Sequence, residues 1–245
     1  MTGVDTAMEI IDSHTHWGPS VSMGTEVTTQ EILKQAEQSG VSQIVVFPFP
    51  SMALAEEGIN QRLLDEANRI KKFIPYDYIP ETMKPIPERK RFYGGKWHWM
   101  RGIQDASSNY QVLEDPKLGE FIEASETIDL PIVFEEALAF TEAFVERTKN
   151  LKIIIPHLGM LGGNPIDFLD AFKARENVHF DTALASSNTV TTFIKSIGHE
   201  RILFGSDIPF GTMKWELEKV LSLPIGDDKK EWILSKNLLR LTGLR

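Results

Sequence analysis

Short apolar runs alternate with amphipathic segments along almost the whole chain of 245 residues. The run Gln43–Phe47 is nearly continuous in apolar residues, which is typical of a strand buried on both faces of a parallel sheet. Similar runs recur at regular intervals and are bounded by proline, glycine or polar residues. The pattern therefore predicts eight strands, at residues 10–16, 43–47, 73–79, 100–104, 131–135, 151–157, 178–181 and 201–207.

The segments between these runs carry apolar residues at helical spacing. Thr28 is followed three residues later by Glu31, which is the spacing of a capping box, and Gly40 supplies a stop. Asp115-Pro116 likewise has the form of an N-cap followed by a proline in the first helical position. Helices are predicted at residues 28–40, 57–71, from 115 onward, and at 141–149, 165–174, 188–197 and 228–241.

Eight strands alternating with helices over this length indicate an α/β protein, and specifically a single (β/α)8 TIM-type barrel domain over residues 1–245. The competing fold is an open doubly wound sheet, which usually carries a glycine-rich phosphate loop after its first strand. Here the first strand leads into His14-Thr15-His16 instead, so the sequence favours the barrel.

Residues 80–97 interrupt this rhythm and are expected to distort the barrel between its third and fourth strands. Three prolines and Gly94-Gly95 make a regular helix unfavourable over most of the segment. Its lysines and arginines give it a positive balance within an acidic chain. A solvated connecting loop is one interpretation, and a lid or a binding loop for an anionic substrate is the other.

Composition excludes several classes of function. A net charge of −9 argues against sequence-independent nucleic-acid binding, and no apolar run approaches the length of a membrane span. The chain has no cysteine, so any metal must be held by histidine and carboxylate groups. The segment from Met1 to Glu9 lacks the apolar core of a signal peptide, so a cytoplasmic location is expected. The expected partner is a small-molecule substrate, and the sequence leaves assembly into a homo-oligomer open.

The polar residues at the predicted strand ends form a coherent set. In a (β/α)8 barrel the carboxyl ends of the strands meet at one face, where catalytic groups lie. Taken singly, each of these residues has an ordinary explanation as a buried histidine, a turn residue or a solvated carboxylate. Charged groups beside a barrel core are costly without a partner, and one divalent metal would serve several at once. The set comprises His14 and His16, Glu135 or Glu136, His157 and Asp207.

These residues lie in motifs that resemble the amidohydrolase superfamily. The motifs are His14-Thr-His16, Ile155-Pro-His157-Leu-Gly159, Gly205-Ser-Asp207-Ile-Pro209 and the final Asn237-Leu-Leu-Arg-Leu. Within the superfamily the chain is similar to the amidohydrolase-related branch, which includes TIM-barrel metal-dependent hydrolases and aminocarboxymuconate-semialdehyde decarboxylase. The resemblance implies that His14, His16 and Asp207 are metal ligands, and that His157 is a ligand or a general acid/base.

Two departures from the family pattern concern the fifth and fourth strands. The family usually has a histidine where this chain has Glu135, which could complete a mononuclear site or bridge two ions. Members with two metals and a bridging carbamylated lysine have that lysine on strand four, whereas this chain offers Gln104 and Asp105 at the end of its predicted fourth strand, which argues against a lysine-bridged pair. The expected cofactor is therefore a divalent metal, Zn²⁺ first and Mn²⁺ second.

The sequence leaves three functions open. The first is hydrolysis of an ester, lactone or amide by metal-activated water, with Asp207 or His157 moving the proton and with Arg101 and Trp17 contacting a small anionic substrate. The second is non-oxidative decarboxylation of an unsaturated or aromatic acid with the same ligands. The third is a degenerate barrel that binds a ligand without turnover because of the exchange at Glu135.

Overall fold

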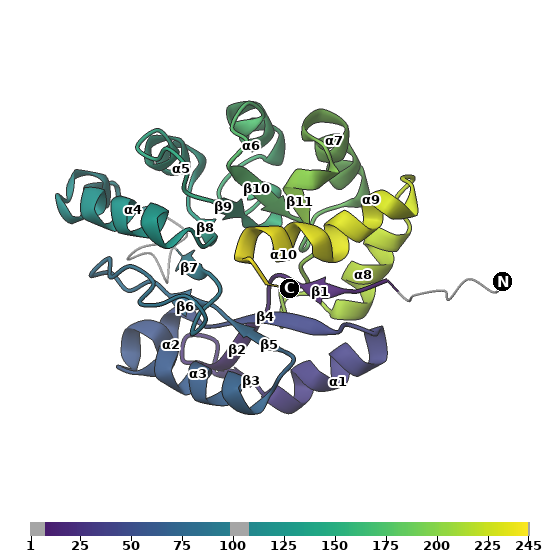
Figure 1. Ribbon diagram of the computed structural model, residues 1–245, viewed down its shortest axis with the longest axis horizontal. Coiled ribbons are helices and arrows are strands. Elements are labelled where there is room, and N and C mark those ends of the chain that lie inside the picture. Colours follow the sequence, from purple (N-terminus) through teal and green to yellow (C-terminus); the bar gives the residue numbers. More distant parts are fainter. Residues whose placement is uncertain (1–7, 99–107, 245) are drawn as a thin grey trace.

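Strands and helices alternate along the chain in the computed structural model, which describes residues 8–98 and 108–244 (Figure 1). The strands are short and mostly buried, as the apolar runs predicted. They are β1 (Ile11–Asp12), β2 (His16–Ser20), β3 (Thr25–Val27), β4 (Gln43–Pro48), β5 (Phe73–Pro75), β6 (Asp77–Tyr78), β7 (Gly95–His98), β8 (Ile132–Glu135), β9 (Ile153–Ile155), β10 (Val178–Asp181) and β11 (Ile202–Leu203).

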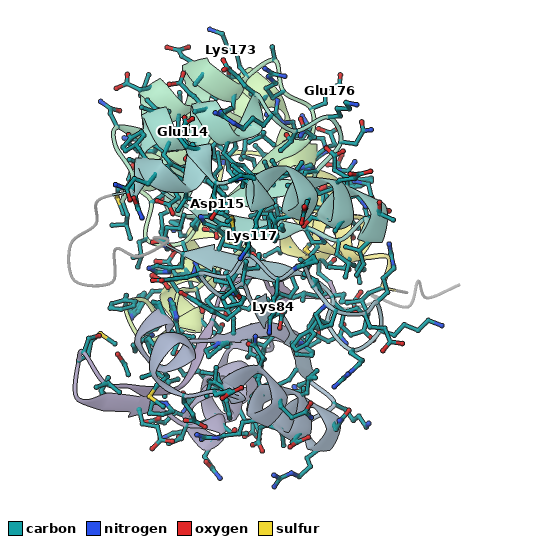
Figure 2. The ribbon with its side chains drawn as sticks, turned by 90° about the vertical axis from the view of Figure 1, so that its left-hand side faces the viewer. Lys84, Glu114, Asp115, Lys117, Lys173 and Glu176 are labelled. Atoms are coloured by element: carbon teal, nitrogen blue, oxygen red, sulfur yellow. The ribbon has the colours of Figure 1, made fainter. Side chains whose placement is uncertain are left out.

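The helices surround these strands, and exposed charged side chains such as Lys84, Glu114 and Lys173 lie on the outer surface (Figures 1 and 2). Within the described residues no helix has the length and apolar character needed to cross a bilayer. The α-helices are α1 (Thr29–Ser39), α2 (Pro50–Ala55), α3 (Ile59–Arg69), α4 (Lys117–Ile128), α5 (Leu138–Val145), α6 (Pro165–Phe172), α7 (Ser187–Ile197), α8 (Met213–Leu221), α9 (Asp227–Glu231) and α10 (Asn237–Thr242).

Shorter helical turns complete the chain. They are η1 (Tyr110–Glu114), η2 (Pro156–Gly159), η3 (His199–Arg201) and η4 (Trp232–Lys236), of which the last joins α9 to α10. The capping box predicted for the first helix is confirmed. The Thr28 side chain accepts a hydrogen bond from the Glu31 backbone, the Glu31 carboxylate accepts one from the Thr28 backbone, and Gly40 ends the helix at a φ of 72°.

The strands form two sheets whose pairings are parallel apart from β2 with β3. One sheet has the order β1-β4-β2-β3, with β5 also paired to β4, and the other has the order β11-β10-β9-β8-β7-β6. This confirms the predicted α/β class with parallel strands. Backbone hydrogen bonds join the sheets at both edges: Tyr76, just before β6, donates to Val46 of β4 (2.9 Å), and Ser13, just after β1, donates to Phe204, just after β11 (2.9 Å).

Side chains of the central strands alternate between two apolar clusters. Val133 and Ile154 belong to an inner cluster together with Leu238 and Leu241 of α10. Their strand neighbours, such as Ile132, belong to the outer cluster, which packs the strands against the helices. The inner face therefore continues from an apolar layer at α10 to the polar residues at the strand ends.

The fourth strand lies earlier in the chain than the sequence predicted. Residues 100–104 lie outside the described residues, whereas Gly95–His98 forms β7 and pairs in parallel with both β6 and β8. The residue just before this strand is Gly94. A larger residue would not fit there, because a Cβ atom would lie 2.4 Å from the Tyr76 ring. The prediction of an irregular segment over 80–97 is thus wrong for its last three residues. The strand was missed because Lys96 and His98 occupy one of its faces, and such polar residues are not typical of a buried barrel strand.

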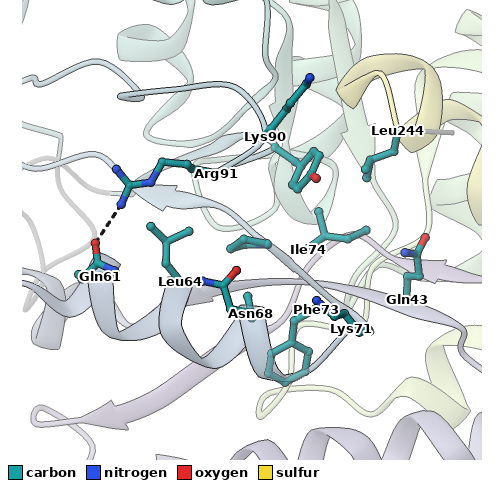
Figure 3. Close-up of a pocket in the computed structure, with 13 residues that line it drawn as sticks. Gln43, Gln61, Leu64, Asn68, Lys71, Phe73, Ile74, Lys90, Arg91 and Leu244 are labelled. Atoms are coloured by element: carbon teal, nitrogen blue, oxygen red, sulfur yellow. Dashed lines mark hydrogen bonds between the residues drawn. The ribbon is translucent and has the colours of Figure 1, made fainter.

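The basic part of that segment contacts the end of the sheets opposite to His14 and His16. Arg89 donates to the backbone carbonyl of Ile128 (2.7 Å), and Arg91 donates to Gln61 (3.0 Å). Lys90 and Arg91 line a pocket that also contains Gln43, the first residue of β4 (Figure 3). These contacts support a connecting segment rather than a lid for Lys90 and Arg91.

Candidate metal centre

Asp12 anchors the first strand to the chain that follows β11. One carboxylate oxygen, Oδ1, accepts hydrogen bonds from the backbone N–H groups of His14 (3.0 Å) and Ser206 (2.9 Å). The other oxygen accepts one from the Thr15 hydroxyl at 3.2 Å. Burial raises the pKa of Asp12 to about 7, and these hydrogen bonds act in the opposite direction. Asp12 therefore holds His14 beside the segment that carries Asp207.

His14, His16 and Asp207 bring three ligand atoms together in a buried position. His14 Nε2 and His16 Nε2 each lie 3.4 Å from Asp207 Oδ1, and all three residues are at most 3% exposed. Neither His14 Nε2 nor Asp207 Oδ1 has a hydrogen-bond partner. A buried polar atom without a partner is costly, so this arrangement indicates that a ligand belongs there.

The spacing of these atoms fits a tetrahedral metal ion. Nitrogen and oxygen ligands lie about 2.0–2.1 Å from zinc, which places neighbouring corners of the tetrahedron about 3.3–3.4 Å apart. Burial, and after it the charge of Lys96, holds the pKa of His14 and of His16 well below the usual range. Both imidazoles are therefore neutral, as metal ligation requires. The donor set fits a divalent cation.

Asp181 orients His14 from the other side. Its Oδ2 atom lies 2.7 Å from His14 Nδ1, and its Oδ1 atom accepts a hydrogen bond from the His157 backbone N–H at 2.9 Å. With Nδ1 donating to a carboxylate, His14 presents the lone pair of Nε2 toward Asp207. Potential ligand atoms of His14, His157 and Asp181 form a second compact group. Asp181 points inward because its strand neighbour Phe180 packs in the outer cluster.

His157 and Asp207 both have backbone conformations that are unfavourable for residues other than glycine. Their φ angles are 56° and 53°. Such conformations cost about 1 kcal/mol or more each, and they cluster at functional sites. The bond from the His157 N–H to Asp181 holds the first, and the bond from the Asp207 N–H to the His14 carbonyl (2.8 Å) holds the second.

The left-handed turn, rather than strand alternation, brings His157 to the site. Strand alternation alone would place Ile153, Ile155 and His157 on one face, but both isoleucines pack in the outer cluster and Ile154 packs in the inner one. The chain leaves the strand at Pro156 and enters η2, in which His157 has a positive φ. His157 Nε2 then lies 3.8 Å from Asp207 Oδ2, and His157 Nδ1 is buried without a partner.

Gly205 allows the chain after β11 to pass close to His14. A Cβ atom at this position would lie 2.9 Å from the Cβ atom of His14 and 3.4 Å from the Asp181 carboxyl carbon. The glycine of the Gly-Ser-Asp motif is thus required by close packing at the site.

Glu135 lies beside these groups but belongs to neither compact set of ligand atoms. Its Oε2 atom is 2.7 Å from Lys96 Nζ and 3.1 Å from His98 Nδ1. Burial alone would raise the pKa of Glu135, but His98 and Lys96 outweigh it and hold that pKa well below the usual range. The neighbouring Glu136 points to the other face of β8, where Trp97 Nε1 donates to it at 2.8 Å.

Sequence reasoning missed Lys96 and His98 because it placed the fourth strand at 100–104. The strand that does lie between β6 and β8 offers Lys96, not Gln104 or Asp105, so the absence of a lysine on strand four was a wrong inference. Alternation of Lys96 and His98 with Gly95 and Trp97 was the available signal. Lys96 is fully buried, and its ammonium lies 4.8 Å from the centre of the Phe47 ring.

The two residues predicted to bind substrate are not brought to this centre by any described contact. Arg101 lies outside the described residues. Trp17 follows His16 in β2 but packs in the outer cluster, and its Nε1 donates to the Thr29 hydroxyl at 3.1 Å. Aromatic rings from other elements surround His16 instead: Phe49 stacks on it with ring centres 4.7 Å apart, and the exposed Phe210 lies edge-on at 5.8 Å.

Comparison with known families agrees with this geometry. A family model described as Amidohydrolase matches residues 98–244, which is more than half of the chain. The chain belongs to the amidohydrolase family. The matched segment contains Glu135, His157, Asp181 and Asp207, whereas the two histidines of the first strand precede it. Tertiary contacts bring those histidines to the matched part of the chain.

Solved structures with the same fold cover both hydrolases and decarboxylases. An amidohydrolase from Burkholderia multivorans with bound zinc has 12% identity and a TM-score of 0.78, covering 97% of this chain and 100% of its own. A probable 2-pyrone-4,6-dicarboxylic acid hydrolase from Acinetobacter baumannii, with citric acid bound, has 13% identity and a TM-score of 0.74, at 97% and 100% coverage.

A third structure is a dihydroxybenzoic acid decarboxylase from Polaromonas with bound manganese and the inhibitor 2-nitroresorcinol. It has 14% identity and a TM-score of 0.73, covering 96% of this chain and 97% of its own. No curated protein matches this sequence. At these identities the likeness establishes the fold, and the reaction has to be argued from the site.

Proposed function

We propose that this amidohydrolase is a metal-dependent hydrolase that acts on an ester, lactone or amide bond of a small substrate. One observation carries the proposal: the ligand atoms of His14, His16 and Asp207 converge in a buried position, and His14 Nε2 and Asp207 Oδ1 have no other partner. Two imidazoles and a carboxylate form the donor set of a catalytic metal site that keeps a position open for water or substrate.

Zinc is our first candidate for the metal and manganese the second, since the structural neighbours include one protein with each. His14, His16 and Asp207 would hold the ion, and Asp181 would fix the orientation of His14. When bound, such an ion polarises a carbonyl oxygen and lowers the pKa of a coordinated water molecule.

His157 and Asp207 are the groups that would move the proton. His157 Nε2 lies 3.8 Å from Asp207 Oδ2, so both groups reach the same small volume. A general base must lie within hydrogen-bond reach of the proton that it takes, and a neutral imidazole or a carboxylate suits that role near pH 7. Arg101 remains our candidate for an anionic group on the substrate.

The test is turnover of a panel of lactones, esters and amides by the zinc-loaded protein, with His14→Ala as the matched control. The expected result is hydrolysis of at least one substrate by the wild type and its loss in His14→Ala. Equal turnover by the two proteins would exclude catalysis at this centre.

Decarboxylation of an aromatic or unsaturated acid is the second candidate, supported by the structural likeness to the manganese-bound decarboxylase. The two reactions differ in their products. Hydrolysis in ¹⁸O-labelled water places the label in the product acid. Decarboxylation releases CO₂ and incorporates no label into the decarboxylated product. Failure of the wild type to take up zinc or manganese on titration would instead support a degenerate site without turnover.

For the fold, we propose that the parallel strands form one closed (β/α)8 barrel within a single domain. The hydrogen bonds between the sheets at both edges support it, as does the inner cluster enclosed by strands from both sheets. A single cooperative unfolding transition, seen equally by far-ultraviolet circular dichroism and tryptophan fluorescence, is expected for such a domain.

A further inference from the structure

Lys96, Glu135 and His98 form a second buried polar cluster next to the candidate metal centre. Lys96 is fully buried, and Glu135 is 5% exposed. The Lys96 ammonium and the Glu135 carboxylate are in direct contact at 2.7 Å, and the register of β7 with β8 places His98 directly opposite Glu135. The contact is thus built into the pairing of two neighbouring strands.

The cluster lies next to the metal centre, so the Glu135 carboxylate could pair with Lys96 or coordinate the metal. The rings of His16 and His98 lie 6.2 Å apart, and His98 Nδ1 is 3.1 Å from Glu135 Oε2. Phe47 contacts both groups: its ring packs edge-on against His14 and His16, and the Lys96 ammonium lies over its face. A buried carboxylate needs a cationic partner, and both an ammonium and a divalent metal could meet that need.

We infer that Lys96 is a positioning residue that holds the Glu135 carboxylate away from the metal, so that His14, His16 and Asp207 bind the ion without it. This inference rests on the proposed metal site. It assigns Glu135 a role different from a ligand of one ion or a bridge between two. Lys96 neutralises Glu135 in place of the metal, and a coordination position stays open for water or substrate.

The inference predicts a distinct outcome for each charge that is removed. In Lys96→Met the carboxylate loses its partner and becomes an added ligand, so the zinc dissociation constant falls by at least about tenfold, the scale of effects measured around metal sites. In Glu135→Gln the amide still accepts a hydrogen bond from Lys96, and the zinc dissociation constant stays within about threefold of the wild type. The double variant Lys96→Met/Glu135→Gln returns to the wild-type coordination.

Two measurements on the full-length protein test this. Competition with a chromophoric chelator gives the zinc dissociation constant, and the visible spectrum of the Co²⁺-substituted protein reports the number and type of ligands. The spectrum is needed because removing a nearby positive charge also strengthens cation binding through space. Wild type, Glu135→Gln and the double variant should share one cobalt spectrum, and Lys96→Met should differ.

Lys152→Met is the matched control. Lys152 pairs with Asp129 at 2.7 Å and immediately precedes β9, at the end of the sheet remote from the metal centre. Its loss should change neither the dissociation constant nor the spectrum.

Two results would overturn the inference. One is a changed cobalt spectrum and weaker zinc binding in Glu135→Gln, which would make Glu135 a ligand already. The other is a Lys96→Met protein with the wild-type spectrum. If Lys96→Met does not fold, the Glu135→Gln spectrum still decides between a ligand and a neutralised carboxylate. If the wild type binds no metal, the proposed function fails before the inference is reached.

Discussion

Two groups of histidine and carboxylate side chains lie side by side in this protein, and they differ in whether the carboxylate has a cationic partner. At the first group, His14 Nε2 and Asp207 Oδ1 are buried without hydrogen-bond partners. At the second, the Glu135 carboxylate contacts the Lys96 ammonium at 2.7 Å, although His98 Nδ1 is, like His14 Nε2, buried without a hydrogen-bond partner. The residue types are nearly the same. The difference is Lys96: Glu135 already has this cationic partner, whereas Asp207 has none in the described part of the chain and is free to bind a metal ion.

The contrast also explains why Glu135 is not grouped with the ligand atoms. Lys96 reaches Glu135 from the adjacent strand and competes with a metal for its carboxylate. Asp207 has no such neighbour within contact distance among the described residues; its neighbours are imidazoles. The following predictions test this difference, beginning with the largest expected effect.

Asp207→Asn should abolish most activity. A bound metal supplies several kcal/mol of transition-state stabilisation, and each 1.36 kcal/mol changes a rate tenfold, so we expect kcat/KM to fall by about 1000-fold or more. The measurement is steady-state kinetics with the substrate found in the panel, together with zinc content by elemental analysis. Wild-type kcat/KM in this variant would remove Asp207 from the reaction.

Lys96→Met should destabilise the protein, because it leaves Glu135 buried and without its ammonium partner. Breaking a buried ion pair in this way costs about 3–5 kcal/mol of the free energy of unfolding. Replacing both partners, as in Lys96→Met/Glu135→Leu, should recover most of that loss. Urea denaturation of the metal-free proteins measures both. A double variant as unstable as the single one would contradict the pairing.

Asp77 offers a third case, a buried carboxylate for which burial outweighs the attraction of Arg91. Burial raises its pKa to about 7. Because the folded-state pKa exceeds the unfolded one, Asp77 lowers stability progressively as pH rises from about 4 to 7, and the full penalty is present above pH 7. Asp77→Asn should therefore gain a few kcal/mol over the wild type at pH 8 and much less at pH 4. Urea denaturation at the two pH values measures the gap, and an equal gap at both would refute the assignment.

Asp181→Asn should weaken metal binding without removing a ligand. Loss of the carboxylate that receives the His14 Nδ1 proton is expected to raise the zinc dissociation constant by about 10–100-fold. Chelator competition provides the measurement. Asp170→Asn, at an exposed position on α6, is the control and should leave the constant unchanged.

Trp17→Phe should have the smallest effect. The change removes the hydrogen bond to Thr29 and should cost about 1 kcal/mol of stability. The Michaelis constant should stay within about twofold of the wild type, because the Trp17 side chain packs in the outer cluster and not against the metal centre. A large rise in the Michaelis constant would restore Trp17 as a substrate contact.

Much of the architecture follows from local sequence. The apolar runs predicted the parallel strands on either side of the centre, and the Thr28–Glu31 capping box and Gly40 predicted the limits of α1. His14, His16, His157 and Asp207 were found because each directly follows such a run. The fourth strand was misplaced because its decisive contacts, with β6 and β8, are remote in sequence and its side chains are polar.

The sequence by itself determined which residues could bind a metal, since the ligand chemistry of histidine and carboxylate is a property of the side chains. Only the tertiary structure decided which of them face one another. A left-handed turn at His157, the approach of Gly205 to His14, and the strand pairing that joins Lys96 to Glu135 are all set by contacts between distant segments. The physical reason is that a buried charge acts through its nearest partner, and the chain order does not specify that partner.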